Sequence, residues 1–386
     1  MNINYIYLIL IIIIILFIIL FIIRKKNIES FENELSNLSY YRCESKMLGK
    51  VLQDIFDNNN IIKSNDNWNI YIPCGYNEVE DELKNILIKD EKTNKYIFGL
   101  NGCDTIVSKN KIWESLVLCF GRKKASTLMP ESFILDDLNE IELFRKSFNP
   151  SLNEIYILKK NVQRKEGLKL TRDYFEIIDG YKEYYRVAQK YITDLYLINQ
   201  RKVNLRIYLL IVIKDNFIYF YVSDKGKCIY TNKKYNDDDL DFESNITSYN
   251  LDMTVYEQNP RDFEELKIFI DENESENIMN FKNGIYLFNK INLLMEEISI
   301  CLSKNLYQSK NIKNTVAFQL FGADVIFDKE LHPYLLELNK GPDMTPRDEI
   351  DENMKNIVQT DMFKIVGVLP NIGSNSFRQI YKNIIN

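Results

Sequence analysis

The sequence predicts an α/β fold, and the order of its apolar segments is the main reason. Between residues 68 and 150, short apolar runs of strand length alternate with amphipathic runs of helix length, which is typical of α/β units. A longer apolar run over residues 208–213 predicts a buried strand. The chain has 386 residues, of which 46% are hydrophobic, enough for two or three layers or subdomains around a sizeable core.

Each predicted element rests on a local pattern in the sequence. Apolar residues at helical spacing predict helices over 48–56, 78–88, 111–121 and 286–307. Short apolar or alternating runs predict strands over 68–73, 96–99, 129–135, 155–159, 168–170, 186–192 and 202–213. Two further apolar strands, 322–328 and 335–339, are separated by a short turn and form a predicted hairpin.

The amino-terminal segment resembles a membrane anchor. Residues 6–23 form an unbroken apolar run, followed directly by Arg24-Lys25-Lys26. As a helix this run spans roughly 27 Å, close to the hydrocarbon thickness of a bilayer, and basic residues flank the cytoplasmic end of a span. A cleaved signal peptide, the rival interpretation, carries its charges before the apolar run and small residues at the cut site. We therefore expect a single-pass membrane protein, in contact with the membrane through residues 6–23, with the rest of the chain on the cytoplasmic side.

Four parts are expected along the chain. Residues 1–26 are predicted as a transmembrane anchor with its basic flank, and residues 27–67 as a helical lead-in or linker. Residues 68–150 are predicted as a smaller α/β subdomain, and residues 151–386 as the main domain.

Charge, cysteine content and histidine content argue against several classes of function. The net charge of −6 argues against a general nucleic-acid binder, so no nucleic-acid partner is expected. The six cysteines are scattered and include no Cys-x-x-Cys pair, so we expect neither a zinc site nor disulfides, and a reducing compartment fits best. The one histidine, His332, lies beside Pro333 in a predicted turn, which leaves catalysis based on histidine poorly supported.

Asp324, Glu337 and Asn339 form a candidate metal site on the predicted hairpin. Glu337 and Asn339 are two residues apart, so on a strand they point to the same face, and Asp324 reaches the same place from the neighbouring strand. Carboxylate and amide oxygens suit a hard cation such as Mg²⁺, with phosphates and water as further ligands. Strands also often end in solvated acids, and on these residues alone the two interpretations carry equal weight.

Cationic side chains at strand ends form a candidate site for an anion. Lys159 ends a strand before a polar loop, where a lysine can hold phosphate oxygens, although an exposed hairpin with solvated lysines is the plainer alternative. Lys202, Asn204 and Arg206 alternate with apolar residues and so share one strand face. Burying two cations there is costly without an anion, which makes a polyphosphate or an acyl phosphate a candidate ligand. An exposed edge strand is the alternative.

Residues 186–192 have the pattern of a strand that runs into a hinge. The exposed backbone of such a hinge can pair with the edge of an adenine ring. Gln189 and Lys190 are the side chains placed to contact that ring.

These segments occur in the order and spacing of the tubulin–tyrosine ligase family, a branch of the ATP-grasp enzymes, and the chain resembles that family over roughly residues 68–368. No single motif is decisive, but the joint order is specific. The segments that carry the resemblance are Ile157-Leu158-Lys159, the loop from Gln163 to Leu168, Val187-Ala188-Gln189-Lys190-Tyr191-Ile192, Arg201-Lys202-Val203-Asn204-Leu205-Arg206, Ile246-Thr247-Ser248-Tyr249, Phe321-Gly322-Ala323-Asp324 and Leu336-Glu337-Leu338-Asn339.

The resemblance implies an ATP-grasp catalytic domain over residues 151–386 and a ligase that joins an amino acid, with glutamate as one candidate, to a protein carboxylate. ATP phosphorylates the carboxylate and an amine then attacks the acyl phosphate, so cations and Mg²⁺ do most of the work. The implied partners are a free amino acid and a protein substrate, either tubulin or another protein with an acidic tail. The implied roles are ATP binding for Lys159, Gln189, Lys190, Ile192, Lys202, Asn204 and Asp324, catalysis for Lys202, Arg206 and Glu337, and Mg²⁺ binding for Asp324, Glu337 and Asn339.

The chain departs from the family pattern at several positions. An aspartate that is usual in the third motif is Asn204, and an arginine that usually follows a turn glycine is missing near Gly226. In the family that arginine helps to hold the substrate acyl group, and Lys227 or Lys233 are the candidate substitutes. Two alternatives therefore stay open: a catalytically impaired, membrane-tethered binding module of the same fold, and an ATP-grasp ligase that acts on a small molecule.

Overall fold

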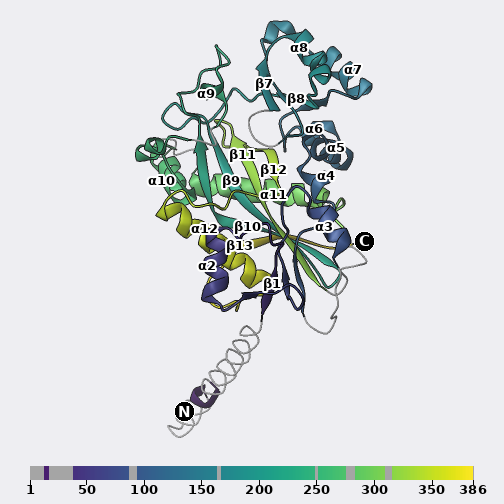
Figure 1. The fold of residues 1–386 in the computed structure, drawn as a ribbon. Helices are drawn as coiled ribbons and strands as arrows, with labels where there is room; N and C mark the ends of the chain where they lie inside the picture. The colour runs from purple at the N-terminus through teal and green to yellow at the C-terminus, as the bar shows by residue number, and fades with distance from the viewer. Residues whose placement is uncertain are drawn as a thin grey trace, which may run out of the picture.

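Two β-sheets and the helices that cover them make up the structure, a computed structural model that describes residues 13–16, 38–86, 94–162, 167–247, 251–274, 283–308 and 315–385. Figure 1 shows the smaller sheet with its helices at the top of the molecule and the larger sheet below it. The chain is therefore a mixed α/β protein, as its sequence predicts. Both sheets combine strands from either side of the boundary predicted at residues 150 and 151.

The larger sheet has nine strands among the described residues. Its central strands are long and antiparallel, whereas the strands at the far edge are short and parallel to one another. In spatial order the strands are β13 (Phe377–Ile384), β10 (Phe217–Tyr230), β9 (Val203–Lys214), β11 (Val316–Phe327), β4 (Tyr96–Phe98), β3 (Ile70–Tyr71), β1 (Ser39–Tyr41) and β2 (Ile62–Lys63), with β12 (Pro333–Asn339) paired to β11.

Helices cover both faces of this sheet, which explains the nearly continuous apolar run in β9. Leu209 and Ile211 pack on one face with residues of α3 (Val79–Asn85), α5 (Lys109–Phe120), α10 (Phe263–Glu274) and α11 (Gly284–Leu302). Tyr208 and Leu210 pack on the other face with residues of α2 (Lys50–Asn58) and α12 (Glu349–Val366). The shorter helices are α4 (Cys103–Val107), α6 (Arg122–Ala125), α9 (Phe242–Asn245), η1 (Pro150–Leu152), η3 (Gly180–Glu183) and η4 (Met253–Glu257).

Helices α7 (Leu138–Ser147) and α8 (Tyr174–Ile178) cover one face of the smaller sheet. Its strands in order are β5 (Ser132–Ile134), β8 (Val187–Lys190), β6 (Tyr156–Lys159) and β7 (Leu168–Thr171). Tyr156, Leu158 and Ala188 pack with Phe144 of α7 in one apolar cluster. Because side chains alternate along a strand, Lys159 and its neighbours at odd positions face the opposite way, towards the larger sheet.

Four of the six cysteines are paired, so the prediction that the chain has no disulfides is wrong. Cys43 is bonded to Cys74, with Cα atoms 5.6 Å apart, and Cys119 of α5 to Cys301 of α11, with Cα atoms 6.0 Å apart. Both separations lie within the range of Cα distances found in disulfides. The absence of a Cys-x-x-Cys motif does not exclude these disulfides, because the bonded cysteines are 31 and 182 residues apart in the sequence.

The predicted single-pass membrane location is also wrong. In the part of the chain that the structure describes, no helix combines the length and the apolar character needed to cross a bilayer. Of the predicted span over residues 6–23, residues 13–16 are described and the others lie outside the described residues.

The predicted secondary structure agrees with the fold in most places. The helices predicted over 48–56, 78–88, 111–121 and 286–307 correspond to α2, α3, α5 and α11 with shifted ends, and the predicted hairpin is the β11–β12 pair. Strand β3 was expected to be the first in the chain, but β1 and β2 pair beside it from within the segment predicted as a helical lead-in. Such two- and three-residue strands are too short to show a periodic pattern.

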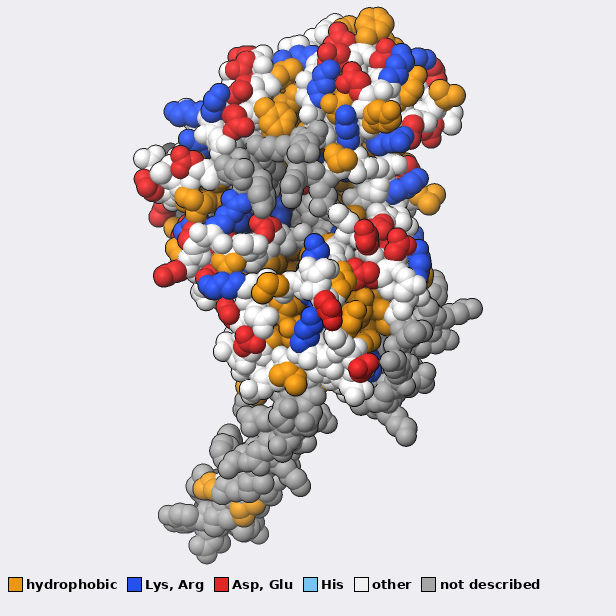
Figure 2. All heavy atoms as spheres, in the orientation of Figure 1, with side chains coloured by type: hydrophobic (Ala, Val, Ile, Leu, Met, Phe, Trp, Pro, Cys, Tyr) orange, Lys and Arg blue, Asp and Glu red, His pale blue; other side chains and the backbone are white. Residues whose placement is uncertain are grey.

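Exposed charges of both signs are mixed on the surface. Figure 2 shows Lys and Arg side chains interspersed with Asp and Glu over the face drawn. Such mixing keeps a surface soluble without attracting one class of charged partner.

Replacing Leu210 by alanine tests the central position of β9. Leu210 is 0% exposed, so Leu210→Ala should lower the free energy of unfolding by about 2–5 kcal/mol. Leu118 of α5 is 90% exposed, so the same change there should alter stability by less than about 0.5 kcal/mol. Urea unfolding of both variants followed by circular dichroism measures the difference, and equal losses would contradict the packing described.

Candidate functional site

A cavity of about 560 Å³ is lined by residues of both sheets. The larger sheet contributes the amino-terminal half of β9 and the β11–β12 hairpin, and the smaller sheet contributes the other face of β6 and β8, away from α7 and α8. All ten residues predicted for the site line this cavity: Lys159, Gln189, Lys190, Ile192, Lys202, Asn204, Arg206, Asp324, Glu337 and Asn339.

The carboxylates of the hairpin meet because of strand register. Asp324 on β11 is paired with Glu337 on β12 and, on its other side, with Arg206 on β9. The Arg206 guanidinium donates two hydrogen bonds to the Asp324 carboxylate, from Nε at 2.6 Å and from Nη2 at 3.1 Å. Gly322 leaves room for this side chain, because a Cβ there would lie 3.0 Å from Cδ of Arg206.

Glu337 is held ionised by the cations around it. Burial raises the pKa of its carboxyl group, but Lys109, Lys159 and Arg206 together outweigh that effect, so the pKa lies below its usual value. Nζ of Lys109 lies 3.6 Å from Oε2 of Glu337, and Nδ2 of Asn339 donates to Oε1 at 3.4 Å. The hairpin therefore presents two carboxylates and one amide oxygen to the cavity, the donor set that Mg²⁺ prefers.

Two lysines are buried in the cavity with too little negative charge around them. Burial lowers the pKa of Lys159 to about 8, and burial together with repulsion by Lys159 lowers the pKa of Lys202 to about 7. Nζ of Lys159 donates to the Leu336 carbonyl at 3.4 Å, while Nζ of Lys202 donates to the Tyr191 hydroxyl at 3.0 Å and the Asn245 carbonyl at 2.9 Å. These partners are neutral, so a multiply charged anion would stabilise both lysines.

Asn204 adds an unpartnered oxygen to the same strand face. Its Nδ2 donates to the Thr247 hydroxyl at 3.0 Å, whereas its Oδ1 is buried without a hydrogen-bond partner. Strand β9 is central rather than at an edge, so the alternative of an exposed polar face does not hold. Buried lysines, paired carboxylates and an orphaned amide oxygen fit the phosphates of a nucleotide with its Mg²⁺.

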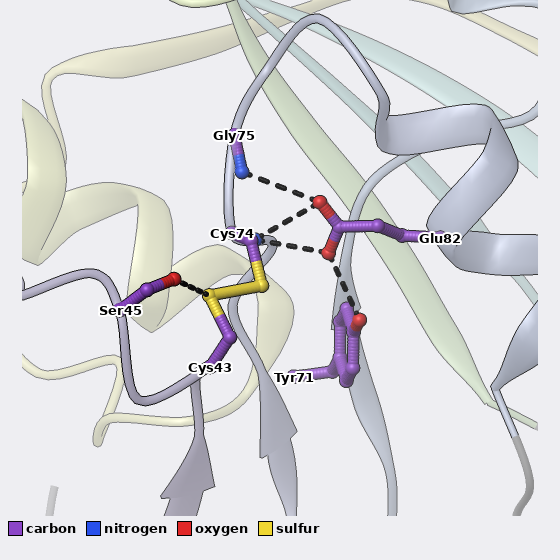
Figure 3. Close-up of a disulfide and its surroundings, with 6 residues drawn as sticks. All are labelled: Cys43, Ser45, Tyr71, Cys74, Gly75 and Glu82. Carbon is purple, nitrogen blue, oxygen red and sulfur yellow. Dashed lines mark hydrogen bonds between the residues drawn. A yellow bond between two sulfur atoms is a disulfide. The ribbon is translucent and has the colours of Figure 1, made fainter.

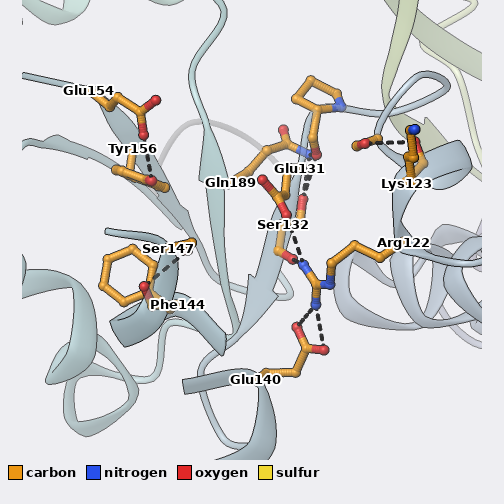
Figure 4. Close-up of polar contacts among 12 residues, drawn as sticks. Arg122, Lys123, Glu131, Ser132, Glu140, Phe144, Ser147, Glu154, Tyr156 and Gln189 are labelled. Atoms are coloured by element: carbon orange, nitrogen blue, oxygen red, sulfur yellow. Dashed lines mark hydrogen bonds and ion pairs between the residues drawn. The ribbon is translucent and has the colours of Figure 1, made fainter. Parts of the chain in front are cut away.

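The predicted hinge residues are held by the smaller sheet. Nε2 of Gln189 donates to the Ser132 hydroxyl at 3.0 Å, and Figure 4 shows Arg122 fixing the same serine by donating to its carbonyl at 3.0 Å. Lys190 forms an ion pair with Glu154. The side chains of Gln189 and Lys190 are thus engaged within the protein, and Ile192 reaches the cavity just beyond the end of β8.

The two lysines suggested as substitutes for a missing arginine lie in different places. Lys227 lines a second, smaller cavity of about 70 Å³ that shares Arg206 with the first, and its Nζ lies 3.5 Å from Oδ1 of Asp351. Lys233 is exposed and pairs with Asp241 at 3.1 Å. Only Lys227 therefore lies beside the site.

Several residues that line the cavity have no signal in the sequence. Lys109 begins α5, and Tyr191 places its ring 4.2 Å from Nζ of Lys202. Arg42, just after β1, and Gln359 of α12 also line the cavity. Each lies outside the predicted motifs or carries an unremarkable side chain. Of the loop from Gln163 to Leu168, residues 163–166 lie outside the described residues.

The fold and the cavity define a mixed α/β protein with a buried, cation-rich site, and comparison with known proteins places it in a family. A sequence profile of the tubulin-tyrosine ligase family matches residues 88–375. The chain belongs to the tubulin-tyrosine ligase family, which confirms the resemblance predicted from its motifs.

Three relatives are 22–27% identical to the chain over the aligned residues. A tubulin monoglutamylase of Mus musculus is 24% identical over 333 residues, covering 81% of this chain and 26% of that protein. A probable tubulin polyglutamylase of Caenorhabditis elegans is 22% identical over 304 residues, covering 76% and 66%. A tubulin glycylase of Tetrahymena thermophila is 27% identical over 273 residues, covering 64% and 26%. The chain thus spans about a quarter to two thirds of the length of these relatives.

Replacing Lys202 by methionine should affect stability and ligand binding in opposite directions. At pH 6 the buried ammonium is mostly charged, so removing it should leave the melting temperature of the unliganded protein unchanged or higher. The Asn245 carbonyl keeps its bond from the Tyr191 hydroxyl at 2.9 Å. A binding anion such as MgATP, at about a hundred times its Kd, should stabilise the wild type by about 2.7 kcal/mol and the variant much less.

Differential scanning fluorimetry with and without the nucleotide makes the measurement. Lys111→Met, on the exposed side of α5, is the matched control and should keep the ligand-induced shift. Strong destabilisation of Lys202→Met, or a full ligand-induced shift of its melting temperature, would contradict the assignment of Lys202 to the binding of an anion.

Proposed function

We propose that the chain is an ATP- and Mg²⁺-dependent ligase with an ATP-grasp catalytic domain, joining an amino acid to a carboxylate of a protein. One observation supports it most: two mutually repelling, buried lysines share a cavity with a pair of carboxylates aligned by strand register. A triphosphate with its metal ion has the charge distribution that complements this arrangement.

In this proposal the residues of the smaller sheet bind the nucleotide base. The segment of Gln189, Lys190 and Ile192 would contact adenine, and Lys159 and Lys202 would hold the phosphates. Asn204 would accept a hydrogen bond from a ribose hydroxyl through its unpartnered Oδ1. Asp324, Glu337 and Asn339 would hold Mg²⁺, which when bound neutralises charge on the phosphoryl oxygens.

The reaction that follows needs no histidine. A carboxylate oxygen of the acceptor attacks the γ-phosphorus of ATP, ADP leaves, and the acyl phosphate forms. The amine of the incoming amino acid then attacks the acyl carbon, phosphate leaves, and the amine loses a proton. Charge develops on phosphoryl and acyl oxygens, where Arg206 and Lys202 would stabilise it. Because Asp324 already orients the Arg206 guanidinium, little reorganisation is required.

The acceptor and the amino acid are proposed from the relatives. The proteins compared above are named as tubulin glutamylases and a tubulin glycylase. We therefore propose an acidic protein segment, such as a tail of tubulin, as acceptor, and glutamate or glycine as the amino acid. A binding module without ligase activity is the competing proposal, favoured by the missing arginine near Gly226, where the chain has Cys228, Ile229 and Tyr230.

Glu337→Gln tests the proposed chemistry. The change keeps the shape of the side chain but removes a ligand charge, so ligase turnover should fall at least a hundredfold while the fold is retained. Turnover is measured as incorporation of radiolabelled glutamate or glycine into a tubulin-tail peptide in the presence of MgATP. Glu330→Gln, an exposed position in the turn of the same hairpin, is the control and should keep full activity. Unchanged turnover in Glu337→Gln would refute the site, and no turnover in the wild type would favour the binding module.

Binding of ATP should be linked to proton uptake. In the unliganded protein the pKa values of about 8 for Lys159 and about 7 for Lys202 leave much of this pair neutral at pH 8. Phosphates beside them raise both pKa values, so binding at pH 8 should take up roughly one proton, and affinity should fall as the pH rises from 7 to 9. Titration calorimetry in buffers of different ionisation enthalpy measures the uptake. A binding enthalpy independent of the buffer would contradict the assignment of these lysines to the phosphates.

A further inference from the structure

Two buried nitrogen atoms without hydrogen-bond partners belong to residues that line the cavity. They are Nε of Arg42, which follows β1, and Nε2 of Gln359 on α12. Both residues line the cavity described above, together with Val51 and Leu52 of α2, and Gln359 is only 5% exposed. An unmatched buried donor costs roughly 1–3 kcal/mol, so two beside one cavity point to an acceptor group on a ligand.

Arg42 also lacks a matching negative charge. Within the described residues it forms no ion pair, and the carboxylate of nearby Glu82 is occupied by the backbone N–H groups of Cys74 and Gly75 (Figure 3). Burial lowers the pKa of Arg42, and Tyr76 and Glu82 offset only part of that effect. An anion that enters the cavity would therefore be attracted to this guanidinium.

The wall that carries Arg42 is fixed before any ligand binds. Cys43 follows Arg42 directly, and its disulfide partner Cys74 is two residues before Tyr76, which also lines the cavity. Gly341 lies so close to the Tyr76 ring that a Cβ at position 341 would be 2.5 Å from two of its atoms. The backbone at Arg42, held in this way, loses little conformational entropy on binding.

We propose that Arg42 and Gln359 bind a carboxylate of the substrate other than the one that is phosphorylated. A carboxylate accepts two N–H donors at once, and a charged donor makes the stronger bond. The inference rests on the proposed ligase function, in which the reacting carboxylate lies beside Arg206 and Glu337. The bound carboxylate is then either the α-carboxylate of the free amino acid or an acidic side chain next to the acceptor residue. Residue 42 lies outside the segment matched to the family, residues 88–375, whereas Gln359 lies within it.

The test measures the affinities of both substrates in variants that remove one donor each. Arg42→Met and Gln359→Leu are titrated with L-glutamate, glycine and a glutamate-rich peptide in the presence of MgADP, so that no turnover is needed. Each variant should weaken one substrate at least tenfold and leave the affinity for MgATP unchanged, and Arg42→Lys should recover part of the loss. Weaker binding of the amino acid assigns its α-carboxylate to the site, and weaker binding of the peptide assigns the acceptor.

Matched controls separate this contact from folding. Arg145→Met, an exposed arginine of α7, and Gln53→Leu, a partly exposed glutamine of α2, should bind all substrates normally. Gln359→Leu removes an unmatched donor, so its melting temperature should not fall. Unchanged affinity for both amino acids and for the peptide in Arg42→Met and Gln359→Leu overturns the inference and leaves the ligase proposal standing. Failure of the wild type to bind MgATP would instead refute the ligase proposal.

Discussion

The pairing of β9 with β11 is the constraint on which the site depends. It places Arg206 opposite Asp324, and the hydrogen bonds of 2.6 and 3.1 Å between them fix both side chains at the edge of the cavity. Breaking a buried pair by removing one partner typically costs 3–5 kcal/mol, because the remaining charge is left uncompensated. Next to this pair, β12 contributes a further acidic side chain to the cavity, and β9 contributes cationic and amide side chains.

Side chains on one face of β9 have two different surroundings along the strand. At even positions of β9, the first residues face the cavity and the later ones, Tyr208 and Leu210, pack against α2 and α12. One strand face therefore serves both binding and core packing. The cavity contains lysines whose positive charge the protein does not neutralise. Burying these charges lowers the stability of the unliganded protein, and such a cost is expected at a functional site.

Much of this arrangement is readable from the sequence, because period-two patterns are local. The spacing of Lys202, Asn204 and Arg206, and that of Glu337 and Asn339, shows which side chains share a face. The part that could not be predicted depends on contacts between distant segments. Arg42, Gln359 and the disulfide partners carry no periodic signal, and only the folded chain shows that they meet. The membrane anchor was predicted from the length of an apolar run and the basic residues after it, and the described helices do not support a membrane span.

The affinity for MgATP in a double-mutant cycle between Lys202→Met and Glu337→Gln tests the central claim most directly. If both residues act on one triphosphate and its metal ion, each change weakens binding and the two effects are not additive, differing from their sum by more than about 0.5 kcal/mol. A cycle in which either single variant binds MgATP as tightly as the wild type would show that these side chains do not share a ligand.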